Sequence, residues 1–142
     1  LNDLNLASKV NAVKATPTQL SLMLNGRTDN INLKVVICGG EDFTISLADV
    51  LQDTFGNVCN IYNEYGPTEC TIGCMCSKYK SQGKTKSVSI GIASPGTYAF
   101  VVNSRKNKFC SPGESGEIYI AGEQVALGYW KLPKEDKKYF FT

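Results

Sequence analysis

The sequence of this 142-residue chain contains no histidine, no long apolar run and little net charge. Without histidine, the side chain that most often binds zinc or transfers protons near neutral pH is missing. No apolar stretch reaches the roughly 18 residues of a membrane-spanning helix, so no membrane association is expected. The formal net charge is +2, and no aromatic residues alternate with the basic ones, which gives no reason to expect nucleic acid as a partner.

Cysteine is well represented, with six residues in the chain. An even number permits disulfides, but several of these cysteines lie inside apolar runs, as free thiols of a protein core do. A chain of this length needs no covalent staples, so we expect reduced thiols and a cytoplasmic location. The closely spaced Cys70, Cys74 and Cys76 suggest a metal site, yet structural zinc sites use paired short spacings, and buried strand positions are expected instead.

The two ends of the sequence suggest an internal fragment of a longer protein. The chain begins at Leu1 with neither a methionine nor the charged and apolar regions of a signal peptide, and it ends on the apolar segment Tyr139–Thr142. Its composition, with 42% apolar and 20% charged residues, is typical of a globular domain.

The first half of the sequence alternates between strand-like and helix-like segments. Thr16 fits a helix N-cap, Pro17 the first helical position and Gln19 a capping box, so a helix is expected to begin there and to end at Gly26. Apolar residues on one helical face between 47 and 55, followed by Gly56, indicate a second helix. The expected strands are Val10–Lys14, Leu33–Cys38 and Val58–Tyr62. This order predicts an α/β fold with a parallel βαβ layer.

The second half of the sequence has a different character. A basic, polar stretch from Tyr79 to Val88 is interpreted as a solvated surface loop. Short strands are expected at Tyr98–Val102 and Glu117–Ala121, with a turn at Ser111–Gly113 between them. We therefore predict an α/β part at residues 1–76 and the start of a β-rich subdomain at residues 77–142, with the boundary near residues 77–87.

Two loops are candidates for binding a ligand, because ligands of parallel α/β sheets lie beyond the carboxyl ends of the strands. One is Gly39–Glu41, which follows the strand ending at Cys38, and the other is Asn63–Glu69. The pair Gly39 and Gly40 lets a flat ligand approach the backbone closely, although most such pairs only turn the chain.

The second loop offers more chemistry. Tyr65 has a flat face on which a base can stack, Gly66 and Pro67 form a rigid turn, and Thr68 has a hydroxyl that can reach a phosphate oxygen. Glu69 offers a hard oxygen ligand for Mg²⁺, which typically binds one or two carboxylates together with substrate phosphates. From the residues alone, a nucleotide site and a solvated polar turn remain about equally supported.

The segment Tyr65–Glu69, which reads Tyr-Gly-Pro-Thr-Glu, resembles a signature of the adenylate-forming superfamily. This superfamily contains the amino-acid-activating domains of nonribosomal peptide synthetases, acyl-CoA synthetases and luciferases. The segment Ser89–Ala93 resembles the family's Ile-Gly-x-Pro motif, although the usual proline is absent. Gly116–Gly122 and Gly128–Pro133 resemble a later motif, so the resemblance covers nearly the whole chain in the correct order. The aromatic residues of the last segment, Tyr129 and Trp130, are expected to pack in the core or against another subdomain rather than to take part in catalysis.

The resemblance implies that the chain is the C-terminal part of a large adenylation subdomain followed by a β-rich subdomain. It implies that ATP is bound by Gly39, Gly40, Glu41, Tyr65, Gly66 and Thr68. Tyr65 would stack on adenine, with the Gly39–Gly40 backbone along it. Thr68 would contact the α-phosphate and Glu69 would help to hold Mg²⁺, which makes Thr68 and Glu69 the catalytic candidates. A carboxylate would attack the α-phosphorus of ATP to give an acyl-adenylate and pyrophosphate.

The resemblance also identifies what the family uses and this chain lacks. The family's phosphate-binding loop, its ribose-binding aspartate and its catalytic lysine are not in the sequence, so the fragment is expected to be inactive by itself. The implied partners are the carrier domain, whose phosphopantetheine thiol receives the aminoacyl group, and the condensation domain of the same synthetase.

The resemblance places the side-chain pocket at Lys14, Val36, Cys38, Glu64, Ile72 and Gly73. Charges that face a pocket are costly unless they are paired or matched by the ligand. Lys14 can donate to a carbonyl oxygen and Glu64 can accept from an amide, so a carboxamide side chain satisfies both, and asparagine is the predicted substrate. Aspartate is the second candidate, but its carboxylate would lie near Glu64. The simplest alternative is that Lys14 and Glu64 pair with each other.

Two other functions compete with this interpretation. An acyl-CoA synthetase would have an apolar pocket, which the charges of Lys14 and Glu64 disfavour. A non-catalytic module that retained the fold is disfavoured by the intact Thr68 and Glu69.

Overall fold

The computed structural model of the chain describes residues 9–25, 32–81 and 85–141. Contacts divide the chain into two compact units, the first comprising Leu1–Tyr65 and Met75–Ile92, and the second Gly66–Cys74 and Ala93–Thr142. The predicted division lay between residues 76 and 77. In the structure, residues 75–92 belong to the first unit and residues 66–74 belong to the second. The predicted helix end at Gly26 lies outside the described residues.

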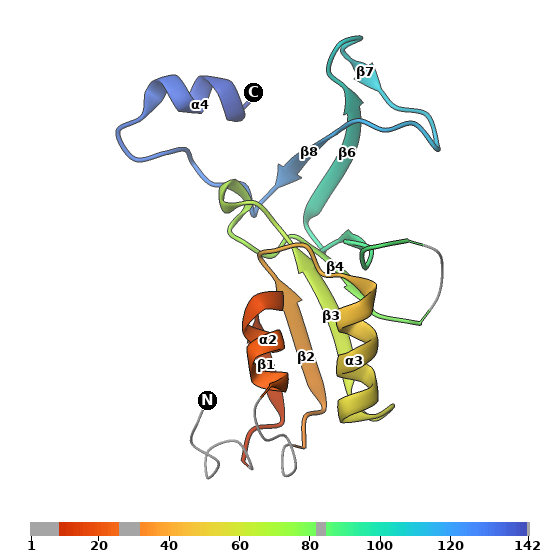
Figure 1. Cartoon of the computed structure of the whole chain (residues 1–142). Helices are drawn as coiled ribbons and strands as arrows, with labels where there is room; N and C mark the ends of the chain where they lie inside the picture. The colour runs from red at the N-terminus through yellow and green to blue at the C-terminus, as the bar shows by residue number, and fades with distance from the viewer. Residues whose placement is uncertain (1–8, 26–31, 82–84, 142) are drawn as a thin grey trace. The chain divides into compact units, whose positions relative to one another are not determined.

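The first unit is built on a mostly parallel sheet, as predicted (Figure 1). Strand β1 pairs with β2 and β2 pairs with β3, both in parallel, and β4 is antiparallel to β3. The sheet order is β1-β2-β3-β4-β5, with the strands at Ala12–Ala15, Val35–Gly39, Asn60–Tyr65, Met75–Lys78 and Ile92–Ala93.

Two helices connect the parallel strands, and both begin as the sequence indicates. Helix α2 (Pro17–Leu24) has Thr16 as its N-cap, and the capping box with Gln19 is complete. Helix α3 (Ile45–Phe55) is capped by Thr44 and is followed by Gly56 with φ 71°, a positive value that glycine adopts readily. These are the crossover helices of two βαβ units.

The core of the first unit lies between the sheet and these two helices. Leu20 of α2, Leu51 of α3 and Ile61 of β3 are almost completely buried in one apolar cluster. Residues at the same register of parallel strands share a face of the sheet, and successive residues alternate between faces. The helices therefore cover one face, and the described residues leave the opposite face partly exposed.

Strand β3 extends three residues beyond its predicted end at Tyr62. Asn63, Glu64 and Tyr65 thus belong to a strand and not to a loop, because the unpredicted strand β4 pairs with them. The polar stretch after β4 is also better packed than predicted. The hydroxyl of Tyr79 donates to Asp49, and the amide of Val88 donates to the carbonyl oxygen of Phe43 at 2.8 Å.

No disulfide joins any of the six cysteines, all of which lie in the described part of the chain. The prediction that Cys70, Cys74 and Cys76 occupy buried strand positions is only partly correct. Cys76 lies in β4 and is half-buried, whereas Cys70 and Cys74 are buried outside the strands.

The second unit contains an antiparallel sheet of three strands in the order β7-β6-β8. The predicted strands correspond to β6 (Thr97–Asn103) and β8 (Glu117–Gly122), and β7 (Lys108–Phe109) lies at the edge. A short 3₁₀ helix, η1 (Thr68–Cys70), and helix α4 (Pro133–Tyr139) complete the unit, and neither was predicted.

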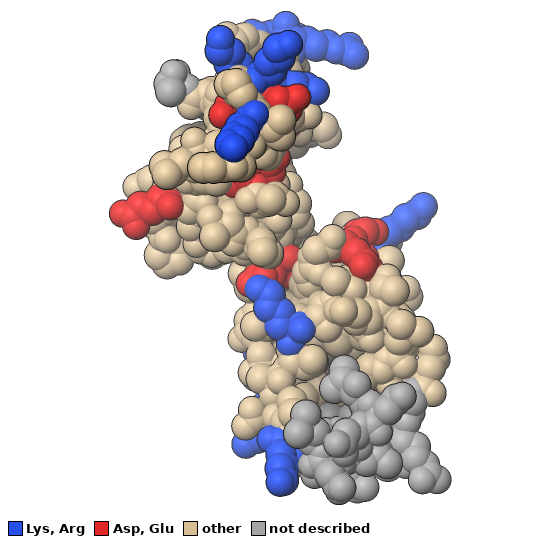
Figure 2. Space-filling view, turned by 90° about the vertical axis from the view of Figure 1, so that its left-hand side faces the viewer, with Lys and Arg blue, Asp and Glu red and all other residues tan. Residues whose placement is uncertain are grey.

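None of the helices in the described residues has both the length and the hydropathy that crossing a membrane requires. Figure 2 shows acidic side chains among the basic ones on the face in view, in keeping with the small net charge of +2.

Candidate functional site

The carboxyl ends of strands β2 and β3 bring two predicted site residues together. Gly39 is the register partner of Glu64. A Cβ atom at Gly39 would lie 2.6 Å from the carbonyl oxygen of Glu64, so a side chain there would force the strands apart. Gly40 follows with φ +85°. The backbone of this fold therefore favours glycine at positions 39 and 40, whether or not the pair also lies beside adenine as predicted.

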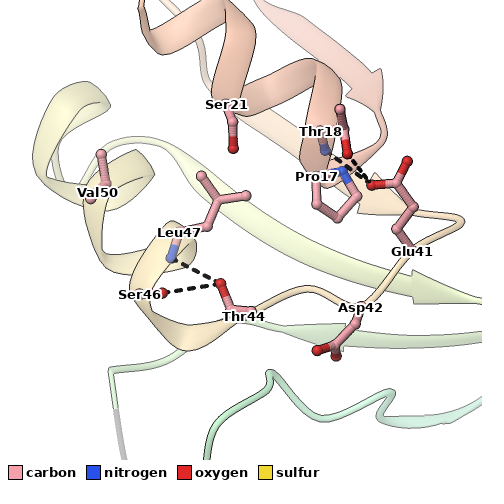
Figure 3. A pocket seen from close by; sticks show the side chains of 9 residues that line it. All are labelled: Pro17, Thr18, Ser21, Glu41, Asp42, Thr44, Ser46, Leu47 and Val50. Atoms are coloured by element: carbon pink, nitrogen blue, oxygen red, sulfur yellow. Dashed lines mark hydrogen bonds between the residues drawn. The ribbon is translucent and has the colours of Figure 1, made fainter.

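The side chain of Glu41 is held by the first turn of helix α2 (Figure 3). Its carboxylate accepts hydrogen bonds from the backbone amide of Thr18 at 3.1 Å and from the Thr18 hydroxyl at 2.6 Å. These bonds from Thr18 hold the pKa of Glu41 below its ordinary value. A carboxylate at a helix N-terminus is stabilising, so Glu41 has a structural role here, and its predicted contact with ATP stays a prediction.

Replacing Glu41 by glutamine should lower the stability of the chain in a pH-dependent way. Because the folded-state pKa is depressed, the ionised carboxylate stabilises the fold above its ordinary pKa of 4.5, and this contribution is lost as pH falls through the folded-state value. The stability difference between wild type and Glu41→Gln should therefore be constant near neutral pH and shrink in acid. Urea unfolding at several pH values measures it. Asp53→Asn, an exposed carboxylate of α3, is the control; an equal and equally pH-dependent loss in this variant would refute the assignment.

An open cavity of about 460 Å³ lies between helices α2 and α3 (Figure 3). Some of the polar groups that line it already form hydrogen bonds with one another. The hydroxyl of Thr44 accepts from the amide of Leu47 at 3.3 Å and contacts the hydroxyl of Ser46. None of the six predicted pocket residues lines it. The lining residues are Pro17, Thr18, Ser21, Glu41, Asp42, Thr44, Ser46, Leu47 and Val50.

Lys14 and Glu64 form an ion pair. Lys14 on β1 lies at the register of Ile37 on β2, two residues before the level of Gly39 and Glu64, so both charged side chains share one face of the sheet. The exposed fractions are 55% for the Lys14 side chain and 22% for that of Glu64, so the pair is open to solvent on the lysine side. The fold thus brings together the two residues that the substrate prediction depends on.

Val36 and Cys38 lie on the other face of the same sheet. Both are 0% exposed and belong to the core beneath the helices. Burial, and to a lesser extent the charge of Glu41, raises the pKa of the Cys38 thiol to about 12, so the thiol is neutral at physiological pH. These two are core residues in this unit, and the structure does not bring them to Lys14 and Glu64. Their contribution to a substrate pocket stays a prediction.

Asn63 is a buried polar residue for which no structural role was predicted. Its side chain is 5% exposed and its amide nitrogen donates to the carbonyl oxygens of Val88 and Ser89 at 3.0 and 3.1 Å. It fixes the segment that leads to β5 against the sheet, one residue before Glu64. The sign of this role in the sequence is a polar amide at a position where the strand pattern places inward-facing apolar residues. It can be recognised only once β3 is known to extend to Tyr65.

The loop Gly66–Cys74, which follows Tyr65, is tightly folded on itself. A Cβ atom at Gly66 would overlap the carbonyl oxygen of Ile72 and lie 2.9 Å from the amide nitrogen of Cys74. Thr71 and Ile72 have φ values of 57° and 78°, a conformation that non-glycine residues rarely adopt. Ile72, a predicted pocket residue, is 64% exposed, and its neighbour Gly73 is half-buried.

Glu69 is held by two contacts from a distant segment of the second unit. Its backbone carbonyl accepts from the amide of Ala126 at 2.7 Å, and its carboxylate oxygen Oε1 accepts from the hydroxyl of Tyr129. Thr68, immediately before it, is exposed. A carboxylate beside an exposed hydroxyl is a suitable donor set for Mg²⁺ with phosphate oxygens.

Within the described residues, no three His, Cys, Asp or Glu side chains cluster closely enough to hold a metal ion. Mg²⁺ at Glu69 would therefore need ligands from its substrate, as is usual for this ion.

The aromatic neighbours of this site differ in packing. Tyr129 is half-buried, whereas Trp130 is 85% exposed and is therefore not a core residue of the second unit; a contact of Trp130 with another subdomain stays a prediction.

Comparisons with known proteins agree with this architecture. The sequence pattern of the family described as AMP-binding enzyme matches residues 3–130. Tyrocidine synthase 3 of Brevibacillus parabrevis is 38% identical over 136 residues, which are 94% of this chain and 2% of the synthase. The D-alanine–D-alanyl carrier protein ligase of Bacillus velezensis is 33% identical over 140 residues, covering 94% of this chain and 27% of the ligase.

A solved structure has the same fold over the whole chain. It is the N-terminal subdomain of Klebsiella oxytoca NpsA in complex with 3-hydroxybenzoyl-AMSN, with a TM-score of 0.82 and 25% identity. The match covers 100% of this chain and 38% of that one. The chain thus spans only a minor part of each of these relatives.

Proposed function

Because the chain belongs to the family of AMP-binding enzymes, we propose that it forms part of a ligase that activates an amino acid with ATP for nonribosomal peptide synthesis. The observation that carries the proposal is the segment Tyr65–Glu69. It starts at the carboxyl end of the parallel strand β3 and continues into a loop in which Tyr129 donates to the Glu69 carboxylate and the amide of Ala126 donates to the Glu69 backbone carbonyl.

In the proposed reaction the chain's own residues bind and orient, and they form no covalent bond. Tyr65 offers its ring to adenine beside the Gly39–Gly40 backbone, and Gly66 allows the chain to turn next to the nucleotide. The Thr68 hydroxyl donates to an α-phosphate oxygen, and Glu69 carries the negative charge that attracts Mg²⁺. Mg²⁺ held there would supply positive charge that offsets the phosphate charge, and the attack of the substrate carboxylate on the α-phosphorus would release pyrophosphate. Holding the reactants in line accounts for the rate enhancement.

The proposed substrate is asparagine, and the ion pair of Lys14 and Glu64 supports it. A carboxamide oxygen can accept from Lys14 and its NH₂ group can donate to Glu64, so the ligand can insert into the pair with both charges still satisfied. Aspartate could use only Lys14. An apolar acid, as in an acyl-CoA synthetase, would separate the two charges without replacing their interaction.

The proposed partner is a carrier domain of the same synthetase, whose phosphopantetheine thiol takes the aminoacyl group from the adenylate, with a condensation domain downstream in the reaction sequence. One relative is named as a ligase of D-alanine and a D-alanyl carrier protein, which supports transfer to a carrier. We also propose a cytoplasmic location, where ATP and reduced thiols are available.

A pyrophosphate-exchange panel on the full-length protein that contains this chain tests the proposal. We expect ATP-dependent exchange with asparagine as the preferred acid and aspartate second. A preference for a large apolar acid would refute the substrate, and exchange with fatty acids would favour an acyl-CoA synthetase. Failure to bind ATP at all would favour a non-catalytic module.

A further inference from the structure

The hydroxyl of Tyr129 donates a hydrogen bond to the Glu69 carboxylate, across 60 residues of sequence. Both side chains are half-buried, so this bond is less exposed to competition from water than a surface contact. A second bond, from the Thr71 hydroxyl to the carbonyl oxygen of Gln124 at 2.8 Å, ties the same two segments together. The segment around residues 124–129 therefore holds the loop that carries Glu69.

Tyr129 is itself fixed in position by its surroundings. Its amide donates to Asp136 Oδ1 at 2.6 Å. The edges of neighbouring rings pack on it, with centroids 6.1 Å away for Tyr139 and 5.5 Å away for Phe140. Gly128, which precedes Tyr129, has φ +136°, a backbone conformation that residues with a side chain rarely adopt. The phenol is thus held by a preorganised cluster.

We propose that Tyr129 is a positioning residue that orients the Glu69 carboxylate for Mg²⁺ bound with ATP. The inference rests on the proposed function. A glutamate side chain rotates about three torsions, and the hydrogen bond from Tyr129 to Oε1 restricts them while it leaves Oε2 to bind a cation. Groups that hydrogen-bond to a metal ligand in this way typically change metal affinity about 10- to 100-fold when they are removed.

The variant Tyr129→Phe tests this directly in the full-length protein, because it removes only the hydroxyl and keeps the ring packing. Mn²⁺, which is paramagnetic, can replace Mg²⁺ and be titrated by electron paramagnetic resonance in the presence of a non-hydrolysable ATP analogue. We expect the apparent Kd of Mn²⁺ to rise about tenfold. The Mg²⁺ concentration for half-maximal pyrophosphate exchange should rise in parallel, with the KM of the amino acid unchanged.

Tyr139→Phe is the matched control, since it removes a hydroxyl from the same ring cluster without touching Glu69. An equal rise of the Kd in this control would assign the effect to ring packing and overturn the proposal. The variant Glu69→Gln distinguishes a failure of the inference about Tyr129 from a failure of the proposed metal role of Glu69. If Glu69→Gln weakens Mn²⁺ binding and Tyr129→Phe does not, the inference fails and the proposed function stands. If Glu69→Gln has no effect, the metal role of Glu69 in the proposed function fails.

Discussion

Gly66→Ala should abolish most of the activity of the full-length protein and destabilise the loop Gly66–Cys74 by about 3 kcal/mol or more. The added methyl group would overlap the backbone carbonyl of Ile72, and backbone atoms cannot rotate away as a side chain can. The loop must therefore open, which displaces Thr68 and Glu69. A displacement of about 1 Å in positioning residues can lower the rate by about 100-fold.

Gly113→Ala is the control for this prediction because the same methyl group meets nothing within 4 Å there. Gly113 has φ +88°, so the substitution still costs about 1 kcal/mol of backbone strain. Urea unfolding of the chain followed by circular dichroism gives the two free energies, and pyrophosphate exchange in the full-length protein gives the rates. Equal destabilisation by both substitutions would mean that the close approach of Gly66 to Ile72 has no energetic consequence.

Local signals predicted the first unit well. Thr16, Pro17 and Gln19 carry a complete helix start within four residues, and the capping box forms as expected. Apolar periodicity likewise located α3, and the three expected strands overlap β1, β2 and β3. The extension of β3 to Tyr65 could not be predicted, because it depends on pairing with β4, and Met75–Lys78 has no alternation strong enough to indicate a strand.

The candidate site was predictable as a set of residues but not as an arrangement. Alignment to a family assigns pocket positions without regard to the face of the sheet. It therefore groups Val36 and Cys38 with Lys14 and Glu64, although the two pairs lie on opposite faces of the sheet. The hydrogen bond from Tyr129 to Glu69 joins residues far apart in the sequence, and an aromatic residue beside glycine indicates packing as readily as a polar contact. Long-range partners of this kind require the fold.

Glu64→Gln should change the substrate preference of the full-length protein toward aspartate. With Glu64 ionised, a bound aspartate carboxylate would face a like charge, and two such charges about 4 Å apart repel by about 4 kcal/mol at an effective dielectric constant of 20. Glu64 is 22% exposed, so solvent screens part of this energy and we expect about 1.5 to 3 kcal/mol. The ratio of kcat/KM for aspartate to that for asparagine should therefore rise about 10- to 100-fold.

The alternative explanation, that Lys14 and Glu64 are only a structural pair, makes a different prediction. Ion pairs this exposed contribute about 0–1 kcal/mol to stability, so Glu64→Gln should barely change the free energy of unfolding. If the pair were only structural, that small loss would be the whole effect and the two acids would be slowed alike.

Lys14→Met completes the comparison. It removes the donor that both acids use, so it should lower kcat/KM for asparagine and aspartate together, whereas Glu64→Gln should change their ratio. Asp53→Asn on helix α3, on the other side of the sheet, is the charge-matched control and should leave the ratio unchanged. An unchanged ratio in Glu64→Gln would remove the basis for a carboxamide substrate, even if adenylation itself is observed.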